Sequence, residues 1–380
     1  MPGLDPGIRA FPLGTDFCAC FVWPYHVDPR VKPGDDELNL WNFCMSFSLV
    51  AELVLLCFVV SLAATGGVLW WLRRRQILDE PNHRSSHTAP TPRGGGLALV
   101  PVLAIAWIVI AVLGMAPMAT LAVVAVGLAL AFLCWRDDRG GLPVLQRFGA
   151  QFLAILVGLF FVPGAGHVFQ DLLPPVLDYA LTAFLWLWFV NLYNFMDGID
   201  GITGGQTAAI GFGAALVAFL SLDPNGGVLP LGLSLGAVAL GFLAWNWAPA
   251  KLFLGDVGSI PLGYLTGWLL LGMAGEGHWA PALILPLYYL VDATLTLLRR
   301  AARFEKIWHA HREHFYQRAV QAGLDHGGVV LRILGANLAL IALAVLGLEW
   351  PWVAVALAFL VVGLLLWELG RRNTAVAPQL

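Results

Sequence analysis

Charged residues are scarce in this chain. Asp, Glu, Lys and Arg make up 12% of the 380 residues, whereas hydrophobic residues make up 59%. Soluble domains carry about 25% charged residues, so the composition and the mean hydropathy of +0.77 exclude an ordinary soluble protein. The net charge of −3 gives no reason to expect a nucleic-acid partner. We therefore expect an all-α, polytopic membrane protein.

Cysteine is scarce as well, and no internal repeat is detectable. The five cysteines show no metal-ligand spacing and lie in or near apolar stretches, which predicts reduced, structural thiols. They are Cys18, Cys20, Cys44, Cys57 and Cys134.

The N-terminal segment 1–44 lacks the basic start and apolar stretch of a signal peptide. It is rich in Pro, Gly and Asp, and a typical membrane-protein start follows at Met45. We expect 1–44 to be an extension outside the functional domain, explained by a start codon assigned too early; a disordered extracytoplasmic tail is the alternative. The membrane-embedded domain is then 45–372, followed by a cytoplasmic tail at 373–380.

About eleven segments are long and apolar enough to cross a bilayer, which takes roughly 20 residues. They lie at about 46–72, 94–114, 118–135, 148–163, 177–194, 203–221, 227–247, 258–275, 279–298, 328–347 and 351–370.

Lys and Arg predict the orientation of these spans, because cytoplasmic loops carry the excess of basic residues. After Met45, every basic residue except Arg332 lies in alternate connections, on one side of the predicted spans. The first span should therefore start outside, and the C-terminus should be cytoplasmic. We name the cytoplasmic connections loop one (73–93), loop two (136–147), loop three (195–202), loop four (248–257) and loop five (299–327).

Polar side chains concentrate at this same side. Span five ends in NLYNFMDGIDGITGG, which places Asn191, Asn194, Asp197 and Asp200 at a spacing of three around one helix end. Loops two, four and five add further candidates and Asp292 lies within span nine; the loop candidates are Asp137, Asp138, Lys251, Asp256, His309, His311, Arg312 and His314.

Carboxylates at a membrane surface need a reason, since each costs about 2.5–3.5 kcal/mol at a helix centre and less toward the interface. Neighbouring carboxylates also raise one another's pKa unless a cation holds them. Mg²⁺ takes one or two carboxylates and leaves its other positions to water and substrate phosphates. The pattern indicates a magnesium-dependent site for a phosphorylated substrate.

Each feature also has a simpler interpretation. The DGIDG stretch could be a glycine-rich turn with Asp200 as a helix cap. The pair at 137–138 could be a solvated helix end, and Asp292 a packing residue. The HAHREH stretch at 309–314 could be an ordinary basic loop or a zinc site, although no cysteine supports zinc.

Several motifs together resemble the polyprenyl-phosphate N-acetylhexosamine-1-phosphate transferase family, glycosyltransferase family 4. They are NLYNFMDGIDGITGG, KLFLGDVGS, DEPNHRSSHTAPTPRGGGLAL, the paired aspartates after span three and HAHREHFYQR, in the family's order over about residues 46–370. The family also includes phospho-N-acetylmuramoyl-pentapeptide transferase. The loop one and loop five motifs look most like the branch that initiates O-antigen synthesis.

The resemblance implies a reaction. A UDP-N-acetyl-aminosugar would donate its sugar 1-phosphate to undecaprenyl phosphate at the cytoplasmic face of the bacterial inner membrane, releasing UMP. Asn194 and Asp256 would be Mg²⁺ ligands, and Asp137 and Asp138 the catalytic pair. The remaining substrate-binding residues would be Asn191, Asp197, Asp200, Lys251, His309, His311, Arg312 and His314.

The sequence departs from the family pattern at Gly141, where a third acid is frequent, and at the spaced histidines of loop five. A transporter or flippase for lipid-linked sugars is the main alternative. Transporters usually hold their polar residues near the midplane of repeated halves, whereas here these residues gather at one face. A CDP-alcohol phosphotransferase is disfavoured because its DGxxAR motif is absent. The sugar and the oligomeric state stay open, with a homodimer as one option.

Overall fold

The computed structural model divides the chain into two units, Met1–Glu52 and Leu53–Leu380, and the division falls inside the first helix. Residues 1–32 of the predicted extension, His309 and the tail at 373–380 lie outside the residues that the structure describes. The described residues are all those other than 1–32, 80–89, 166, 222–226, 307–310 and 372–380.

Helices dominate the described residues, as a chain rich in long apolar segments requires in a membrane. The structure is consistent with the predicted all-α fold, and two short strands of two residues each, β1 (Leu78–Asp79) and β2 (Thr91–Pro92), pair antiparallel in loop one. The helices are α1 (Pro33–Arg74), α2 (Gly96–Val112), α3 (Ala119–Gly140), α4 (Val144–Leu159), α5 (Pro175–Phe195), α6 (Ile202–Leu220), α7 (Val228–Asn246), α8 (Asp256–Gly275), α9 (Trp279–Ile284), α10 (Leu287–Ala302), α11 (Phe315–Gln321), α12 (His326–Leu346) and α13 (Pro351–Arg371).

A multi-pass membrane protein is confirmed, since eight helices in the described part are long and apolar enough to cross a bilayer. Helices α2 and α4 are shorter apolar helices that match two more of the eleven predicted segments. The predicted span at 279–298 is instead two helices, α9 and α10. Helix α1 begins at Pro33, earlier than the predicted start near residue 46. The count of eleven spans and their orientation remain predictions.

The interruption between α9 and α10 comes at Pro286, which has no backbone N–H to continue a helix. The Gln206 side chain of α6 donates to the carbonyl oxygen of Leu285 at 3.4 Å. Asn337 of α12 donates to the Gln206 side-chain oxygen at 2.9 Å, so one buried amide bonds to the backbone next to the break and a second amide holds the first. Inside a bilayer a helix can be interrupted only where other protein groups form hydrogen bonds with the backbone that the interruption frees.

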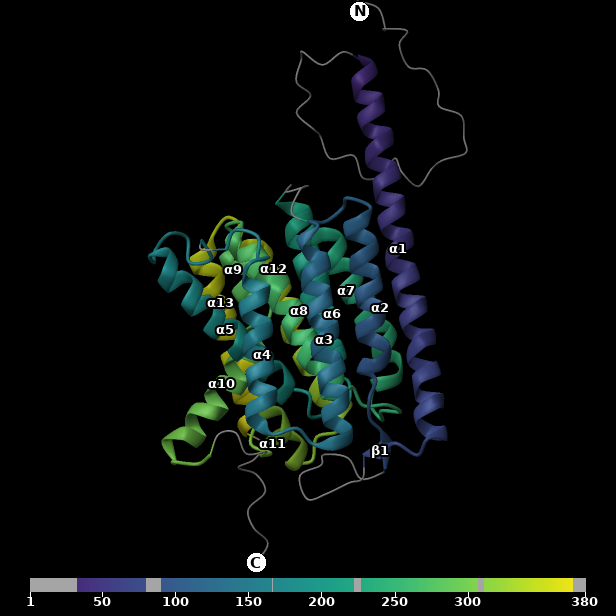
Figure 1. Cartoon of the computed structure of the whole chain (residues 1–380). Helices are drawn as coiled ribbons and strands as arrows, with labels where there is room; N and C mark the ends of the chain where they lie inside the picture. The colour runs from purple at the N-terminus through teal and green to yellow at the C-terminus, as the bar shows by residue number, and fades with distance from the viewer. Residues whose placement is uncertain (1–32, 80–89, 166, 222–226, 307–310, 372–380) are drawn as a thin grey trace, which may run out of the picture. The chain divides into compact units, whose positions relative to one another are not determined.

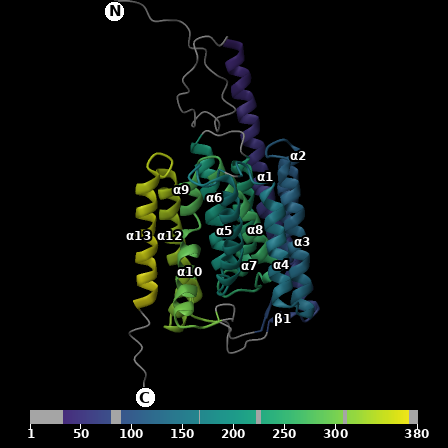
Figure 2. The same ribbon diagram turned by 60° about the vertical axis from the view of Figure 1, so that its left-hand side comes forward.

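Helix α8 is the centre of the second unit. Of its apolar stretch 94% is buried, against α3 and α5 and, more narrowly, α2, α6 and α7. Helices α12 and α13 stand side by side at one edge, whereas α2, α3 and α4 lie at the other (Figure 2). Small residues allow the closest contacts: a Cβ on Gly211 of α6 would lie 2.6 Å from the amide nitrogen of Gly236 in α7. Such contacts are a usual way for membrane helices to associate.

Loop one and loop four join at the start of α8. The amide nitrogens of Gly94 and Gly95 donate to the carbonyl oxygen of Phe253, at 3.0 and 2.8 Å. A Cβ on Gly96 would lie 2.3 Å from the Cα of Gly258, so only glycine allows this approach of the two backbones. Strand β1 and helix α11 lie at this same end of the second unit (Figure 1).

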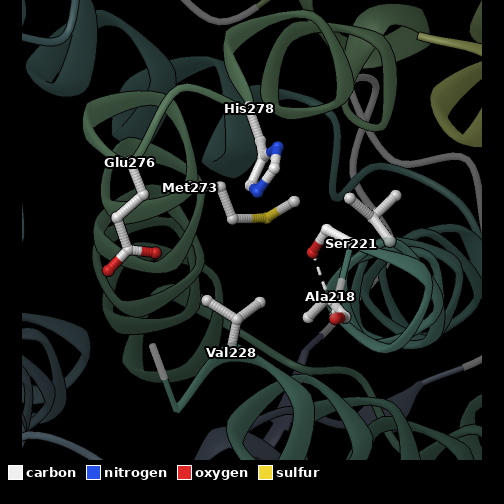
Figure 3. A pocket seen from close by; sticks show the side chains of 7 residues that line it. Ala218, Ser221, Val228, Met273, Glu276 and His278 are labelled. Atoms are coloured by element: carbon white, nitrogen blue, oxygen red, sulfur yellow. Dashed lines mark hydrogen bonds between the residues drawn. The ribbon is translucent and has the colours of Figure 1, made fainter. Parts of the chain in front are cut away.

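A small cavity, of about 10 Å³, lies at the opposite end of α8. Figure 3 shows His278, Glu276 and Met273 facing the ends of α6 and α7 around it, with Ser221 donating to the carbonyl oxygen of Ala218 at 3.1 Å. A cavity of this size holds about one water molecule. It is therefore too small for a nucleotide or a sugar.

The substitution Gly96→Ala tests the glycine contact. Because the new methyl group would overlap the backbone of Gly258, we expect a loss of about 1–3 kcal/mol in the free energy of unfolding. The measurement is the thermal midpoint in detergent. Gly335→Ala in α12 is the matched control, because a Cβ there meets nothing within 4 Å. Equal midpoints for the two variants would contradict the packing described.

Candidate active site

Asp256, the first residue of α8, lies at the centre of a charged cluster. Gly255 precedes it with φ +77°, a backbone conformation that favours glycine and turns the chain into the helix. The Arg93 guanidinium donates to Asp256 Oδ1 at 2.6 Å, because the pairing of loops one and four places Arg93 beside the start of α8. The same guanidinium lies 3.9 Å from Asp138 Oδ1.

The paired aspartates come from the last turn of α3. Gly141 ends this helix with φ +65°, and the amide nitrogen of Leu142 donates to Asp137 Oδ1 at 2.5 Å. Arg147, in the first turn of α4, donates to Asp137 Oδ2 at 3.0 Å and lies 3.8 Å from Asp256 Oδ2. The short turn between α3 and α4 therefore sets Arg147 between two carboxylates.

These five side chains form an alternating series of charges, which we call the charge chain. It consists of Asp138, Arg93, Asp256, Arg147 and Asp137 in spatial order. The alternation lowers the cost of placing three carboxylates together at a membrane surface. It also leaves each guanidinium with donor capacity beyond its ion pair, since an arginine carries five N–H groups.

Two polar groups from the end of α5 adjoin the charge chain. Ser259, one turn after Asp256, donates to Asn194 Oδ1 at 2.6 Å, so the Asn194 amide and Asp256 flank the same helix end. Asp197 is half-buried in loop three. Burial and the nearby Asp256 raise the pKa of the Asp197 carboxyl to about 6, against the opposing effects of the Thr203 hydroxyl and the Arg93 guanidinium.

Three predicted site residues have other surroundings. Asn191 donates to Gln151 of α4 at 3.0 Å. The Asp200 carboxylate accepts from the amide nitrogen of Ala250 at 3.0 Å and lies 3.2 Å from His326 Nδ1, so it joins loop three to loop four and α12. Lys251 is exposed, with its ammonium 5.4 Å from the centre of the Trp245 ring. The structure does not place Lys251 in the charge chain.

Loop five brings two of its predicted residues together. The ring centres of His311 and His314 are 4.8 Å apart. Burial, His314 and Arg300 lower the pKa of His311 to about 4, so its imidazole is neutral at pH 7. Arg312 is half-buried.

Tyr316 connects loop five to loop three. Its hydroxyl donates to the carbonyl oxygen of Phe195 at 3.1 Å. A Cβ on Gly198 would lie 2.1 Å from that hydroxyl oxygen, so glycine is required next to Asp197. His314 stacks on the Tyr316 ring, with centres 5.7 Å apart. The histidine loop therefore packs against the loop that carries Asp197.

The sequence analysis missed Arg93 and Arg147 as members of the charge chain, and Gln151 as the partner of Asn191. Arg93 lies in the PTPRGGG motif, where a cation followed by three glycines was the available signal. Arg147 and Gln151 are one turn apart on α4 and had no comparable signal, because their partners come from α3, α5 and α8.

The donor set fits a magnesium ion. Four carboxylates (Asp137, Asp138, Asp197 and Asp256) against two guanidinium groups leave a formal charge of −2 when all are ionised. No three His, Cys, Asp or Glu side chains form a metal-binding group within the described part of the chain. Mg²⁺ does not need one, because it keeps several waters and substrate oxygens among its ligands.

Comparison with known proteins points to one family. The sequence matches the model of "Glycosyl transferase family 4" over residues 120–274, a range that contains the paired aspartates, the asparagine-aspartate series and Asp256.

Three relatives illustrate the similarity. A Bacillus subtilis protein named probable undecaprenyl-phosphate N-acetylglucosaminyl 1-phosphate transferase is 29% identical over 74% of this chain and 81% of its own. The Yersinia pestis undecaprenyl-phosphate alpha-N-acetylglucosaminyl 1-phosphate transferase is 27% identical over 76% of this chain and 83% of its own. The Lactiplantibacillus plantarum phospho-N-acetylmuramoyl-pentapeptide-transferase is 36% identical over 34% of this chain and 42% of its own. The match to the family model over residues 120–274 and the names of these relatives together support glycosyl transferase family 4, the polyprenyl-phosphate N-acetylhexosamine-1-phosphate transferases, as the family that this chain resembles.

Proposed function

We propose that the protein transfers an N-acetyl-aminosugar 1-phosphate from a UDP-sugar to undecaprenyl phosphate, as the first membrane step of cell-surface polysaccharide synthesis. The observation that carries this proposal is the charge chain, which joins loops one, two and four at the start of α8. The names of the relatives favour N-acetylglucosamine as the sugar.

The reaction exchanges one phosphorus–oxygen bond for another. An oxygen of undecaprenyl phosphate bonds to the β-phosphorus of the UDP-sugar, and the bond from that phosphorus to the bridging oxygen of UMP breaks. The products are undecaprenyl-diphospho-sugar and UMP. A phosphate monoester is largely dianionic at pH 7, because its second pKa is near 6. The attacking oxygen therefore needs little help from a base, and positioning and charge stabilisation carry most of the catalysis.

The two arginines are suited to that task. Arg93 and Arg147 each touch Asp256 and one of the paired aspartates, so these carboxylates fix the guanidinium groups where a diphosphate would bind. An arginine held in this way presents its remaining donors to phosphate oxygens. Asp137 is itself held by Arg147 and Leu142, which favours a positioning role for Asp137 over proton abstraction.

Mg²⁺ completes the proposed site. Asn194 and Asp256 would hold the ion, which when bound neutralises negative charge on the phosphates. Loops three and five would receive the nucleotide and the sugar, with His311 neutral at pH 7 and available as a hydrogen-bonding group. By the positive-inside rule, the basic loops favour the cytoplasmic face of the inner membrane for this end of the protein. A cytosolic nucleotide-sugar and a membrane lipid would meet there.

The direct test uses purified protein in detergent with undecaprenyl phosphate, Mg²⁺ and a panel of radiolabelled UDP-N-acetyl-aminosugars. We expect label from one sugar to pass into the lipid extract, with one UMP released for each lipid product. If label stays in the aqueous phase for every sugar of the panel, the proposal is wrong. If proteoliposomes moved a preformed lipid-linked sugar across the bilayer instead, the transporter alternative would hold.

Asp256→Asn tests the metal assignment. The substitution keeps the size of the side chain but removes its charge, and we expect turnover to fall at least about 10²-fold. A ligand that binds only the folded state raises stability, so Mg²⁺ should raise the thermal midpoint of the unaltered protein but not of the variant. Asp171→Asn in the loop before α5 is the control. A full Mg²⁺-dependent shift in Asp256→Asn would contradict the assignment.

Asp197→Asn tests the electrostatics of loop three through pH. The pKa of Asp197 is about 6 when folded and about 3.9 when unfolded. Between these values the folded state keeps a proton that the unfolded state has lost, so this group lowers stability as pH rises. Without Mg²⁺, the midpoint of Asp197→Asn relative to the unaltered protein should therefore increase from pH 4 to pH 7. A difference that is constant with pH would refute the shifted pKa.

A further inference from the structure

Asp292 of α10 is a fully buried carboxylate that lies outside the charge chain. It accepts three hydrogen bonds, from the hydroxyl groups of Tyr288 at 3.1 Å and Thr296 at 3.4 Å and from the amide nitrogen of Phe315 at 3.0 Å. The first two partners belong to its own helix, one turn to either side. The third belongs to loop five, 23 residues later.

The bond to Phe315 fixes the start of α11. Phe315 is the first residue of that helix, whose opening amide groups have no partner within the helix itself. The Gln317 side chain accepts from the amide nitrogen of His314 at 3.3 Å and closes the same turn. The carboxylate of α10 therefore holds the segment that follows the histidines in one place, and α11 is too short to hold itself.

His314 is also held by Asp292. Its side chain is 2% exposed, and its Nδ1 lies 3.5 Å from Asp292 Oδ1. That nitrogen has no hydrogen-bond partner among the described residues. If the two groups moved slightly closer, the Asp292 carboxylate would accept a hydrogen bond from an N–H at this position. A carboxylate on one imidazole nitrogen sets the tautomer and the ring orientation, and leaves the other nitrogen to act on a ligand.

The held segment reaches the proposed active site. The His314 ring stacks on Tyr316, and the Tyr316 hydroxyl donates to Phe195 just before Asp197. The His311 ring lies beside His314 on the loop. The contacts of Asp292 thus extend from the interior of α10, through His314, to the loop that carries Asp197.

We propose that Asp292 is a positioning residue that docks loop five and orients His314, so that the pair of histidines is presented to the diphosphate of the donor. This inference rests on the proposed function for its substrate. It assigns to Asp292 no contact with the substrate. Its effect on the reaction is indirect, through the orientation of an imidazole and the order of loop five.

The test compares Asp292→Asn with a matched control. Asp178 at the start of α5 is also fully buried, and it accepts from the amide nitrogen of Phe169 at 2.9 Å and from the hydroxyl of Thr182, four residues on, at 3.3 Å. Asparagine keeps an acceptor for the backbone amide at both positions. Both variants should therefore fold, and they should lose similar amounts of thermal stability.

The two variants should differ in kinetics. Loss of a group that orients another typically costs 10–100-fold, and we expect a loss of about that size in kcat/KM for the UDP-sugar in Asp292→Asn. The KM for undecaprenyl phosphate should stay unchanged, and Asp178→Asn should show neither effect. In a double-mutant cycle, His314→Gln should add little to Asp292→Asn, because both changes remove one interaction. The proposal would be overturned if the two substitutions reduced kcat/KM by independent factors that multiply in the double variant. It would also be overturned if Asp178→Asn reduced kcat/KM as much as Asp292→Asn.

A second measurement does not depend on catalysis. Diethyl pyrocarbonate modifies accessible imidazoles, and mass spectrometry follows each histidine separately. Asp292→Asn should increase the modification rate of His311 and His314 but not of His278, which lies at the opposite end of α8. Unchanged rates would overturn the positioning role even if transfer is observed. If the modification rates rise but the protein has no transferase activity, the positioning role of Asp292 is upheld and only the proposed function is rejected.

Discussion

The close contact between residues 92–96 and 253–258 is the constraint on which the proposed active site depends. Two backbones meet where neither carries a side chain, with the position of a Gly96 Cβ only 2.3 Å from Gly258. Arg93 and Asp256 flank this contact and are brought to 2.6 Å, although 163 residues separate them in the chain. The glycines thus act indirectly, by setting the distance between two charges.

The charges near this contact illustrate how a membrane protein tolerates acidic residues. A buried carboxylate is costly, and breaking a buried ion pair costs more than the pair itself contributes. In the charge chain no carboxylate faces only another carboxylate, since an arginine separates each from the next. Asp292 follows a different solution, with three neutral hydrogen-bond donors and a histidine. The charge chain therefore stabilises its carboxylates with arginine charges, whereas neutral hydrogen-bond donors and a histidine surround the carboxylate of Asp292.

The sequence was sufficient to find the apolar helices and the acidic ends of α3, α5 and α8, because hydropathy and local spacing are visible in one segment at a time. It could not show that Arg93 and Arg147 both bind Asp256, because these pairs join segments far apart in the chain. Lys251 illustrates the reverse error: it is close in sequence to Asp256, yet it extends over Trp245. The break at Pro286 was missed because apolar residues continue on both sides, and because the amide that bonds to the adjacent backbone comes from α6.

The separation of Arg93 and Asp256 also has a consequence for biosynthesis. A ribosome adds roughly 5–20 residues per second, so Arg93 leaves it about 10–30 s before its partner. Over that interval the aspartates of loops two and three emerge in turn, and loop five comes later still. A chain that stalls before α8 carries the acidic loops without the helix start that assembles them. Nascent fragments that end before α8 should therefore lack the complete charge chain, because Asp256 is the residue that both arginines share.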